Sequence, residues 1–266
     1  MKTTKLFVAA MAAASLFVSC NNDDSAPAAT GTGKLNLEFD NVYAGNNLIL
    51  ETQPNTTSGN EVLKVSLLKY IVSNIKLTKS DGTVFTYPKS QSYFIVDETD
   101  VASQILKLEN IPSGDYVSVS FGIGVDQQQW ELGADGQGDF LALAQTEDML
   151  WSWGAGYKFL AFEGTFTSPG VGSPTVFMVH TGKTGTDYNY TSVTLPLTNA
   201  ALVRTNITPQ IHVFADASKI IDGQNNILLS ENNSGGTGAM IMGGANLALI
   251  TANLSEMFTI DHVHND

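Results

Sequence analysis

Short runs of alternating apolar and polar residues follow one another along the chain from Lys34 onward, with turn residues between them. In the first run Leu35, Leu37 and Phe39 alternate with polar residues, which is the period of a strand with one buried face. The pattern favours short strands over long amphipathic helices. It predicts an all-β fold, either an antiparallel β-sandwich or a barrel-like domain, with short helices in the loops.

Turn residues divide the rest of the chain. Asp81-Gly82 between two apolar runs is typical of a hairpin, and residues 112–115 form a second turn before a strand over Tyr116–Val125. Helices are expected near Phe140–Ala144 and over Ala245–Glu256. Further strands are expected at Tyr157–Phe166, Thr175–His180, Ser192–Leu197 and Ile207–Phe214.

The N-terminal segment has the composition of an export signal. Lys2 and Lys5 precede an apolar run over residues 6–18, which is too short to span a membrane. Ser19 then precedes the only cysteine, Cys20. This order is typical of a bacterial lipoprotein, so we expect Cys20 to carry the lipid.

Three parts of the chain follow from this interpretation. Residues 1–19 are expected to be the signal peptide, residues 20–33 a flexible tether of small and polar residues, and residues 34–266 a single domain. The protein is expected at the outer membrane, held by its lipid and facing either the periplasm or the cell exterior.

Charge narrows the choice of partners. The chain has 26 acidic and 13 basic residues and a net charge of −13. Nucleic acid is therefore not expected as a partner, while an acidic surface raises the local concentration of cations without selecting among them. With Cys20 committed to a lipid, no cysteine is left for a disulfide or a thiolate metal site.

Common catalytic motifs are not found. The sequence has no G-x-S-x-G, P-loop, H-E-x-x-H or Rossmann motif, so a hydrolase is not expected. What the chain does offer is a set of imidazole and thioether groups that can bind a soft metal ion. The candidate ligands are His180, His262, His264, Met178, Met240 and Met242.

These candidates form pairs two residues apart. In extended backbone Met178/His180, Met240/Met242 and His262/His264 each point to one side of a strand. Nitrogen and thioether donors without a thiolate suit copper, above all Cu(I), whereas zinc would usually add a third imidazole or a carboxylate such as Asp261.

Two of the histidines are distinguished by their neighbours. His180 is the strongest single candidate because a glycine-containing segment follows it, which opens the backbone around the imidazole. We interpret His212, between Ile211 and Val213, as a buried histidine with a structural role rather than a ligand.

The stretch over residues 149–159 holds two of the three tryptophans. In extended backbone Trp151 and Trp153 face the same side, and Gly154 and Gly156 leave room beside them. Indoles in this arrangement can pack in a core, stack on a ligand or be oxidised.

Segments along nearly all of the expected domain carry a resemblance to a known family. They are residues 35–39, 59–61, 68–77, 111–116, 121–125 and 149–159, Glu163-Gly164, His180 with Gly182, and residues 257–265. In this order and spacing the chain resembles the MbnP-like copper-binding family, whose members are exported proteins and lipoproteins.

The resemblance implies a β-rich extracytoplasmic protein that binds copper and is not an enzyme. In relatives, copper is held by histidines and by a tryptophan that a di-haem, peroxidase-like cytochrome partner has oxidised to kynurenine. His180 matches a histidine-glycine motif of the family, and Trp151 or Trp153 matches the region of the modified tryptophan. Because no histidine lies near Asn41, His262 or His264 is expected to supply the missing ligand.

Two other functions fit the same composition. A cell-surface glycan-binding lipoprotein would use Trp130, Trp151 and Trp153 as a stacking platform, which requires exposed indoles. A structural partner of a membrane complex would bind neither metal nor ligand.

Overall fold

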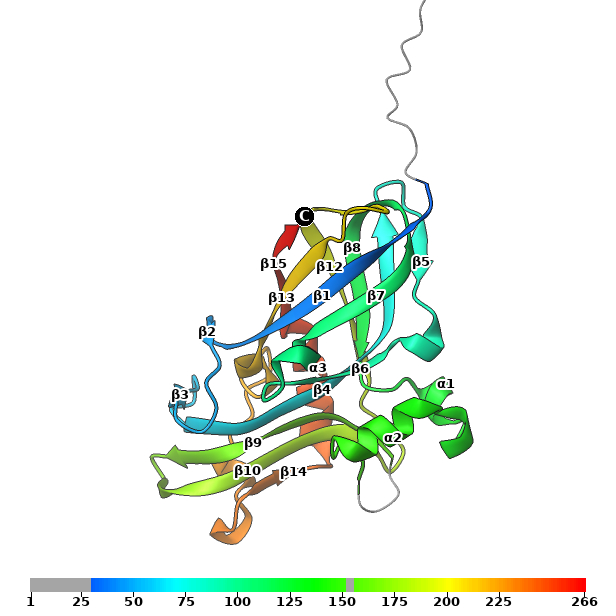
Figure 1. Ribbon diagram of the computed structural model, residues 1–266. Coiled ribbons are helices and arrows are strands. Elements are labelled where there is room, and N and C mark those ends of the chain that lie inside the picture. The colour runs from blue at the N-terminus through cyan, green and yellow to red at the C-terminus, as the bar shows by residue number, and fades with distance from the viewer. Residues whose placement is uncertain (1–29, 152–155) are drawn as a thin grey trace, which may run out of the picture.

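The computed structural model describes residues 30–151 and 156–266, and two sheets dominate this part of the chain. The predicted all-β fold is confirmed, with short helices between strands. Most neighbouring strands are antiparallel, but β1 pairs with β13 and β10 pairs with β14 in parallel. Figure 1 shows β15, β13 and β1 side by side in the upper half of the molecule, and β9, β10 and β14 below β4.

The five-stranded sheet brings together segments from both ends of the described chain. Its path is β15 (Phe258–His264), β13 (Gln210–Asp216), β1 (Thr32–Tyr43) and β2 (Asn46–Asn47), and β7 (Ile105–Pro112) also pairs with β1.

The ten-stranded sheet is built around one long strand, β4. Its path is β11 (Asp187–Tyr188), β10 (Val171–Thr184), β9 (Lys158–Ser168), β4 (Val62–Lys79), β8 (Gly114–Ile123) and β12 (Thr191–Val203). The short strands β3 (Asn55–Thr56), β5 (Val84–Thr86) and β6 (Tyr93–Asp97) pair with β4, and β14 (Ala239–Ile241) pairs with β10.

Helices fill the connections. The α-helices are α1 (Gln127–Trp130), α2 (Asp139–Thr146) and α3 (Ala245–Asn253), and the last two lie where the sequence predicts helices. Short 3₁₀ helices cover Lys89–Gln91, Val101–Gln104, Ala134–Gly136, Ala217–Ile220, Ser230–Asn232, Ser234–Gly236 and Leu254–Glu256. Within the described residues no helix is both long and apolar enough to cross a membrane.

The predicted hairpin at Asp81-Gly82 is confirmed. Gly82 has φ +85°, a value that glycine adopts without steric penalty, and the turn joins β4 to β5. The apolar run before this turn is one continuous strand of 18 residues. Register shifts against β9 and β8 interrupt its pairing, and Asn74 within it has φ +51°. Such bulges bend a strand, which lets β4 take part in pairing with several partners.

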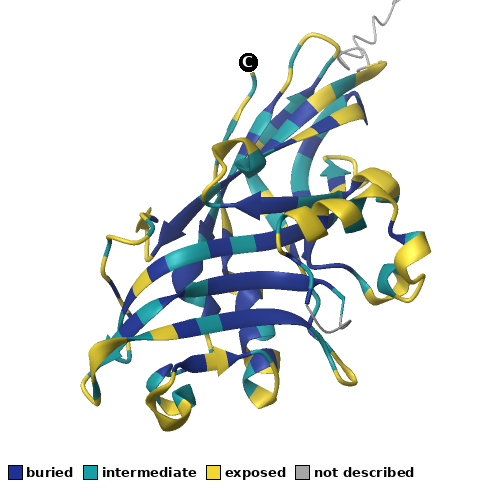
Figure 2. Cartoon of the chain, turned by 60° about the horizontal axis from the view of Figure 1, so that its bottom comes forward, coloured by how far each residue is buried: buried dark blue, intermediate teal, exposed yellow. Residues whose placement is uncertain are grey.

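The core lies between the two sheets and contains the alternating residues of β1. Phe39 is fully buried, and its ring contacts those of Phe121 on β8 and Phe258 on β15 at centroid distances of 5.3 and 6.0 Å. Figure 2 shows that many of the strands are buried along much of their length, while most loops are exposed. Phe258 therefore fixes β15, a strand of the five-stranded sheet, against the main core.

Candidate metal centre

Three imidazoles gather on the outward face of the five-stranded sheet. His212 lies on β13, and His262 and His264 lie on the neighbouring strand β15. One nitrogen from each comes within 4.8 Å of the others, and no other such group of His, Cys, Asp or Glu occurs among the residues that the structure describes. We call these three residues the histidine triad.

A β-bulge decides which way the histidines of β15 point. Ile260 pairs with Val213 and packs against the core, whereas His262 pairs with His212 on the outward face. Side chains alternate along a strand, so Ile260 and His262 would share a face in a regular ladder. Asp261 is the extra residue between these two pairs, and its insertion reverses the alternation. The bulge thus places His262 and His264 beside His212.

Within the triad the rings are in direct contact. The Nε2 atoms of His262 and His264 are 2.9 Å apart. The rings of His212 and His262 stack at a centroid distance of 4.2 Å, and the ring of His264 lies nearly perpendicular to both. The ring nitrogens that lie close together carry more lone pairs than a single proton shared between two of them can bond to. A cation placed between these nitrogens would bind the lone pairs that remain.

Carboxylates hold the opposite nitrogens of two of these rings. Glu38 Oε2 lies 3.0 Å from His212 Nδ1, and Asp261 Oδ2 lies 2.7 Å from His262 Nδ1. Glu38 is in register with His212 through the parallel pairing of β1 and β13, and it also accepts a hydrogen bond from Gln210 Nε2. Metal-binding histidines usually have such a partner, which fixes the tautomer and the ring orientation.

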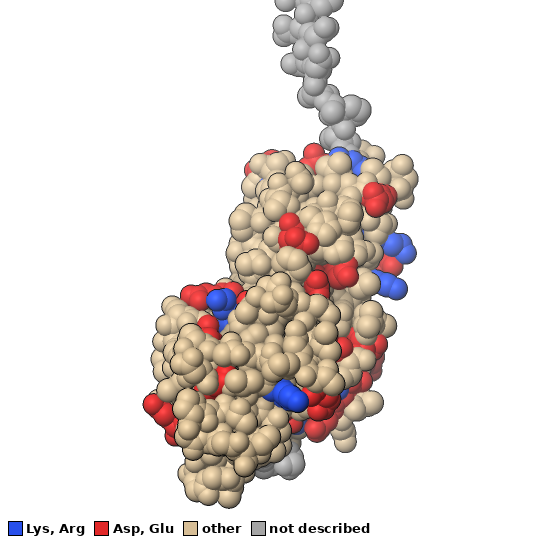
Figure 3. Space-filling view, turned by 90° about the vertical axis from the view of Figure 1, so that its left-hand side faces the viewer, with Lys and Arg blue, Asp and Glu red and all other residues tan. Residues whose placement is uncertain are grey.

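The surroundings of the triad are acidic. Partial burial and the nearby carboxylates of Glu38 and Asp261 raise the pKa of Asp40, although His212 acts in the opposite direction. Burial also lowers the pKa of His212; Glu38 partly offsets this and the other two imidazoles lower it further. This shift favours the neutral form of His212, which is the form that binds metal. Figure 3 shows that Asp and Glu are more widespread than Lys and Arg on the face that it presents.

His180 lies in the other sheet, on β10, and is 4% exposed. Its Nε2 lies 2.7 Å from Glu163 Oε1 on β9, and its ring lies 5.4 Å from the ring of Trp151. A Cβ at Gly182 would come within 3.0 Å of Trp151 Nε1, so the glycine leaves space for the indole. The structure thus brings His180 and Trp151 together, as the resemblance implied, but apart from the triad.

The methionines also lie away from the triad. Met178 on β10 is in register with Met240 on β14, and Met240 is half exposed. Met242 follows directly after β14. All three belong to the region of the ten-stranded sheet, so the triad itself is a set of nitrogen donors with carboxylates around them.

The family resemblance suggests a ligand histidine near Asn41, but the chain has no histidine there. The side chain of Asn41 is a buried amide. Asn41 Nδ2 donates to Glu98 Oε2, and its Oδ1 accepts from the hydroxyl of Tyr70, both at 2.9 Å. The amide is thus fully used by the core and is not part of a metal site.

Two tryptophans, Trp130 and Trp151, line one groove of about 470 Å³. Trp151 is 5% exposed, and the ammonium group of Lys183 lies 4.7 Å from the ring centre of Trp130. Trp153 and Cys20 lie outside the described residues.

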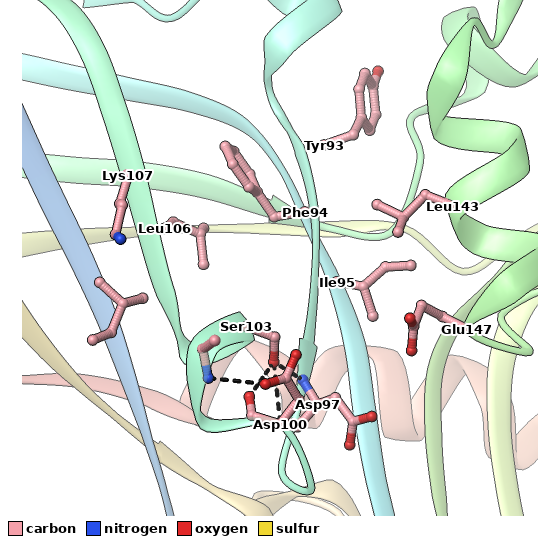
Figure 4. A pocket seen from close by; sticks show the side chains of 12 residues that line it. Tyr93, Phe94, Ile95, Asp97, Asp100, Ser103, Leu106, Lys107, Leu143 and Glu147 are labelled. Atoms are coloured by element: carbon pink, nitrogen blue, oxygen red, sulfur yellow. Dashed lines mark hydrogen bonds between the residues drawn. The ribbon is translucent and has the colours of Figure 1, made fainter.

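A separate pocket of about 410 Å³ lies between β6, β7 and α2 (Figure 4). Its most buried carboxylate, Asp97, pairs with Lys69 at 2.9 Å and accepts hydrogen bonds from Thr99. Glu147 pairs with the same lysine. Because the chain itself satisfies these charges, the pocket offers no second metal centre.

The prediction that His212 is buried was wrong. Its side chain is 19% exposed and joins the triad. A signal for this was available: Ile211 and Val213 alternate with His212, which places it on the opposite, outward face of β13. The bulge at Asp261 has no comparable signal in the sequence.

Two comparisons with known proteins give a match. A family model described as MbnP matches residues 32–242. A solved structure, MbnP from Methylosinus trichosporium, is similar with a TM-score of 0.44 and 15% identity, covering 80% of this chain and 82% of that one. No curated protein gives a significant match. The family match includes His180 and His212 and ends before His262 and His264.

Proposed function

The chain belongs to the MbnP family, and on this premise we propose that it is an exported lipoprotein that binds copper at the histidine triad, for copper acquisition or handling. The observation that carries the proposal is the convergence of three imidazole nitrogens within 4.8 Å. In this proposal the protein binds and hands on a metal and is not an enzyme.

The donor set fits copper. Imidazole binds copper and zinc well, and three imidazoles are a common ligand set for both. The carboxylates of Glu38 and Asp261 lie on the Nδ1 nitrogens of His212 and His262, which leaves the Nε2 nitrogens of these rings to bind an ion. The acidic surface would raise the concentration of cations near the site.

The N-terminal sequence supports the proposed location of the protein. A signal peptide over residues 1–19 and lipidation of Cys20 would anchor the domain to the outer membrane, on its periplasmic or its exterior side. Palmitate labelling in the native host, compared with Cys20→Ala, tests the anchor. An unlabelled wild-type protein would contradict it.

Metal analysis after equilibrium dialysis tests the site. We expect the wild-type protein to retain about one copper per chain and the double variant His262→Ala/His264→Ala to lose it. His180→Ala is the matched control, since it removes an imidazole in the other sheet. Full retention of copper in the double variant, with loss in His180→Ala, would move the site to His180 and refute the triad.

A second candidate site is favoured by the contact between Trp151 and His180. Both side chains are buried, and their rings lie 5.4 Å apart. If a di-haem, peroxidase-like partner oxidises Trp151, opening of the indole gives an aryl amine and a ketone, which can bind a metal where the intact indole cannot. Mass spectrometry of peptides from protein made in its own host tests this, and an intact Trp151 and Trp153 would contradict it.

The burial of Trp151 counts against the glycan-binding alternative. A stacking platform needs an open indole face, and Trp151 is only 5% exposed. Trp130 is half-buried, with Lys183 over its ring.

A further inference from the structure

The triad offers three protein donors, and within residues 30–151 and 156–266 no further His, Cys, Asp or Glu donor atom lies within 4.8 Å of all three. The nearest polar neighbour is Gln210, whose Nε2 lies 3.2 Å from His212 Nε2. This amide is already used: its Nε2 donates to Glu38, and its Oε1 accepts from Asn36 Nδ2 at 3.4 Å. Glu38 and Asp261 are likewise engaged, with the Nδ1 nitrogens of His212 and His262.

The open side of the triad faces solvent. The side chains of His212 and His262 are 19% and 43% exposed, and His264 is classed as exposed. The triad lies on the outward face of its sheet, opposite the core residues Ile211 and Val213. A ligand from solution can therefore reach the nitrogens without a change in the fold.

The chemistry of the donors favours a divalent ion. The methionine sulfurs that would select Cu(I) lie in the region of the other sheet, which leaves imidazoles at the triad. Three carboxylates surround them, those of Glu38, Asp40 and Asp261. A doubly charged cation compensates this negative charge better than a singly charged one.

We propose that the triad holds a divalent cation with one coordination position open to solvent, at which a donor ligand from solution binds. Structural sites are closed by four protein ligands, whereas sites with three protein ligands leave a fourth position for water or another small ligand. An incoming donor at this position is the first step of passing the metal to another molecule. The inference rests on the proposed function, because it requires the triad to bind metal.

Azide titration of the protein loaded with one equivalent of Cu²⁺ tests the open position. Azide is a small anion that binds a free position on copper and produces a new absorption band and a changed electron paramagnetic resonance spectrum. We expect a saturable spectral change that reaches one azide per copper. His180→Ala should respond like the wild type, since its side chain is in the other sheet.

Gln210→His is the decisive variant. Position 210 pairs with His264 across β13 and β15 and already lies beside His212, so an imidazole there can fill the fourth position. We expect this variant to retain copper and to lose most of the azide response.

The outcomes separate the two proposals. The triad is supported if the wild type retains copper and His262→Ala/His264→Ala loses it. If azide then leaves the spectra of the copper-loaded wild type unchanged, the open position is refuted while the triad site remains. If His262→Ala/His264→Ala retains copper as the wild type does, both fail. An azide response that Gln210→His leaves at full strength also refutes the inference.

Discussion

The carboxylate of Glu38 offers the sharpest test of how the sheet tunes the triad. Glu38 Oε2 lies 3.0 Å from His212 Nδ1, which leaves Nε2 as the nitrogen proposed to bind the metal. Glu38→Gln keeps an acceptor of nearly the same size but removes the charge. We expect this change to weaken metal binding through His212 without removing any ligand.

The magnitude follows from the position of the pair. Outer partners of metal ligands typically contribute about 10–100-fold in affinity, which corresponds to about 1.4–2.8 kcal/mol. The side chains of Glu38 and His212 are 26% and 19% exposed, so solvent screens the pair in part, and the amide retains one hydrogen bond. We therefore expect a loss of about tenfold, near the lower end of that range.

Stability of the metal-free protein should change little. Partly exposed ion pairs contribute about 0–1 kcal/mol, and removing one of three neighbouring carboxylates relieves repulsion with Asp40 and Asp261. A selective loss of affinity would thus separate orientation of the imidazole from general destabilisation.

Competition with a chromophoric copper chelator, together with urea unfolding of the metal-free protein, measures both quantities. Glu109→Gln is the matched control, because Glu109 pairs with Lys34 at an exposed position on the same sheet. Unchanged copper affinity in Glu38→Gln, with strong loss in His212→Ala, would show that Glu38 does not orient the ligand.

Three further predictions concern the strand that carries the triad and its protonation. Deleting Asp261 removes the extra residue of the bulge and should leave a regular ladder in which His262 and His264 still face outward, so copper should be retained after dialysis, though more weakly because the carboxylate at His262 Nδ1 is lost; complete loss of copper would contradict this register. Phe258→Ala should lower the free energy of unfolding in urea by about 3–5 kcal/mol, because the ring is 2% exposed and packs 5.2 Å from that of Phe121; a loss below about 1 kcal/mol would contradict this packing. Burial lowers the pKa of His212 below its ordinary value of 6.5; Glu38 opposes this shift and the other imidazoles reinforce it. The contribution of His212 to the stability of the metal-free protein should therefore be complete above pH 6.5. It should be lost as the pH falls through the lowered pKa. Unfolding measured across this range checks the direction, with His212→Ala as the flat reference.

Much of the fold could be predicted because local patterns and the final structure agree. The alternation of Leu35, Leu37 and Phe39 is the burial pattern of β1, and the glycine of Asp81-Gly82 adopts the positive φ that its turn requires. Predicted strand ends differ from observed ones: β13 covers residues 210–216 rather than 207–214. Propensity alone does not report where partner strands begin and end.

The candidate site was only half predictable, and the reason is its dependence on pairing between distant strands. The pair His262/His264 could be recognised from its spacing. Its approach to His212 depends on a bulge and on the pairing of β13 with β15, neither of which is encoded in a local motif. The prediction of a single copper site that joins His180 to His262 or His264 stays untested, although the structure places these residues in different sheets.

The parallel pairing of β1 with β13 joins Glu38 to Gln210 across 172 positions of sequence. Contacts of such high sequence separation form slowly, because a long loop must close before the pairing is stable. Isolated fragments and early folding intermediates would carry the same histidines without their shared geometry. Tight copper uptake should consequently appear late in refolding, which makes the ion itself a reporter of completed sheet assembly.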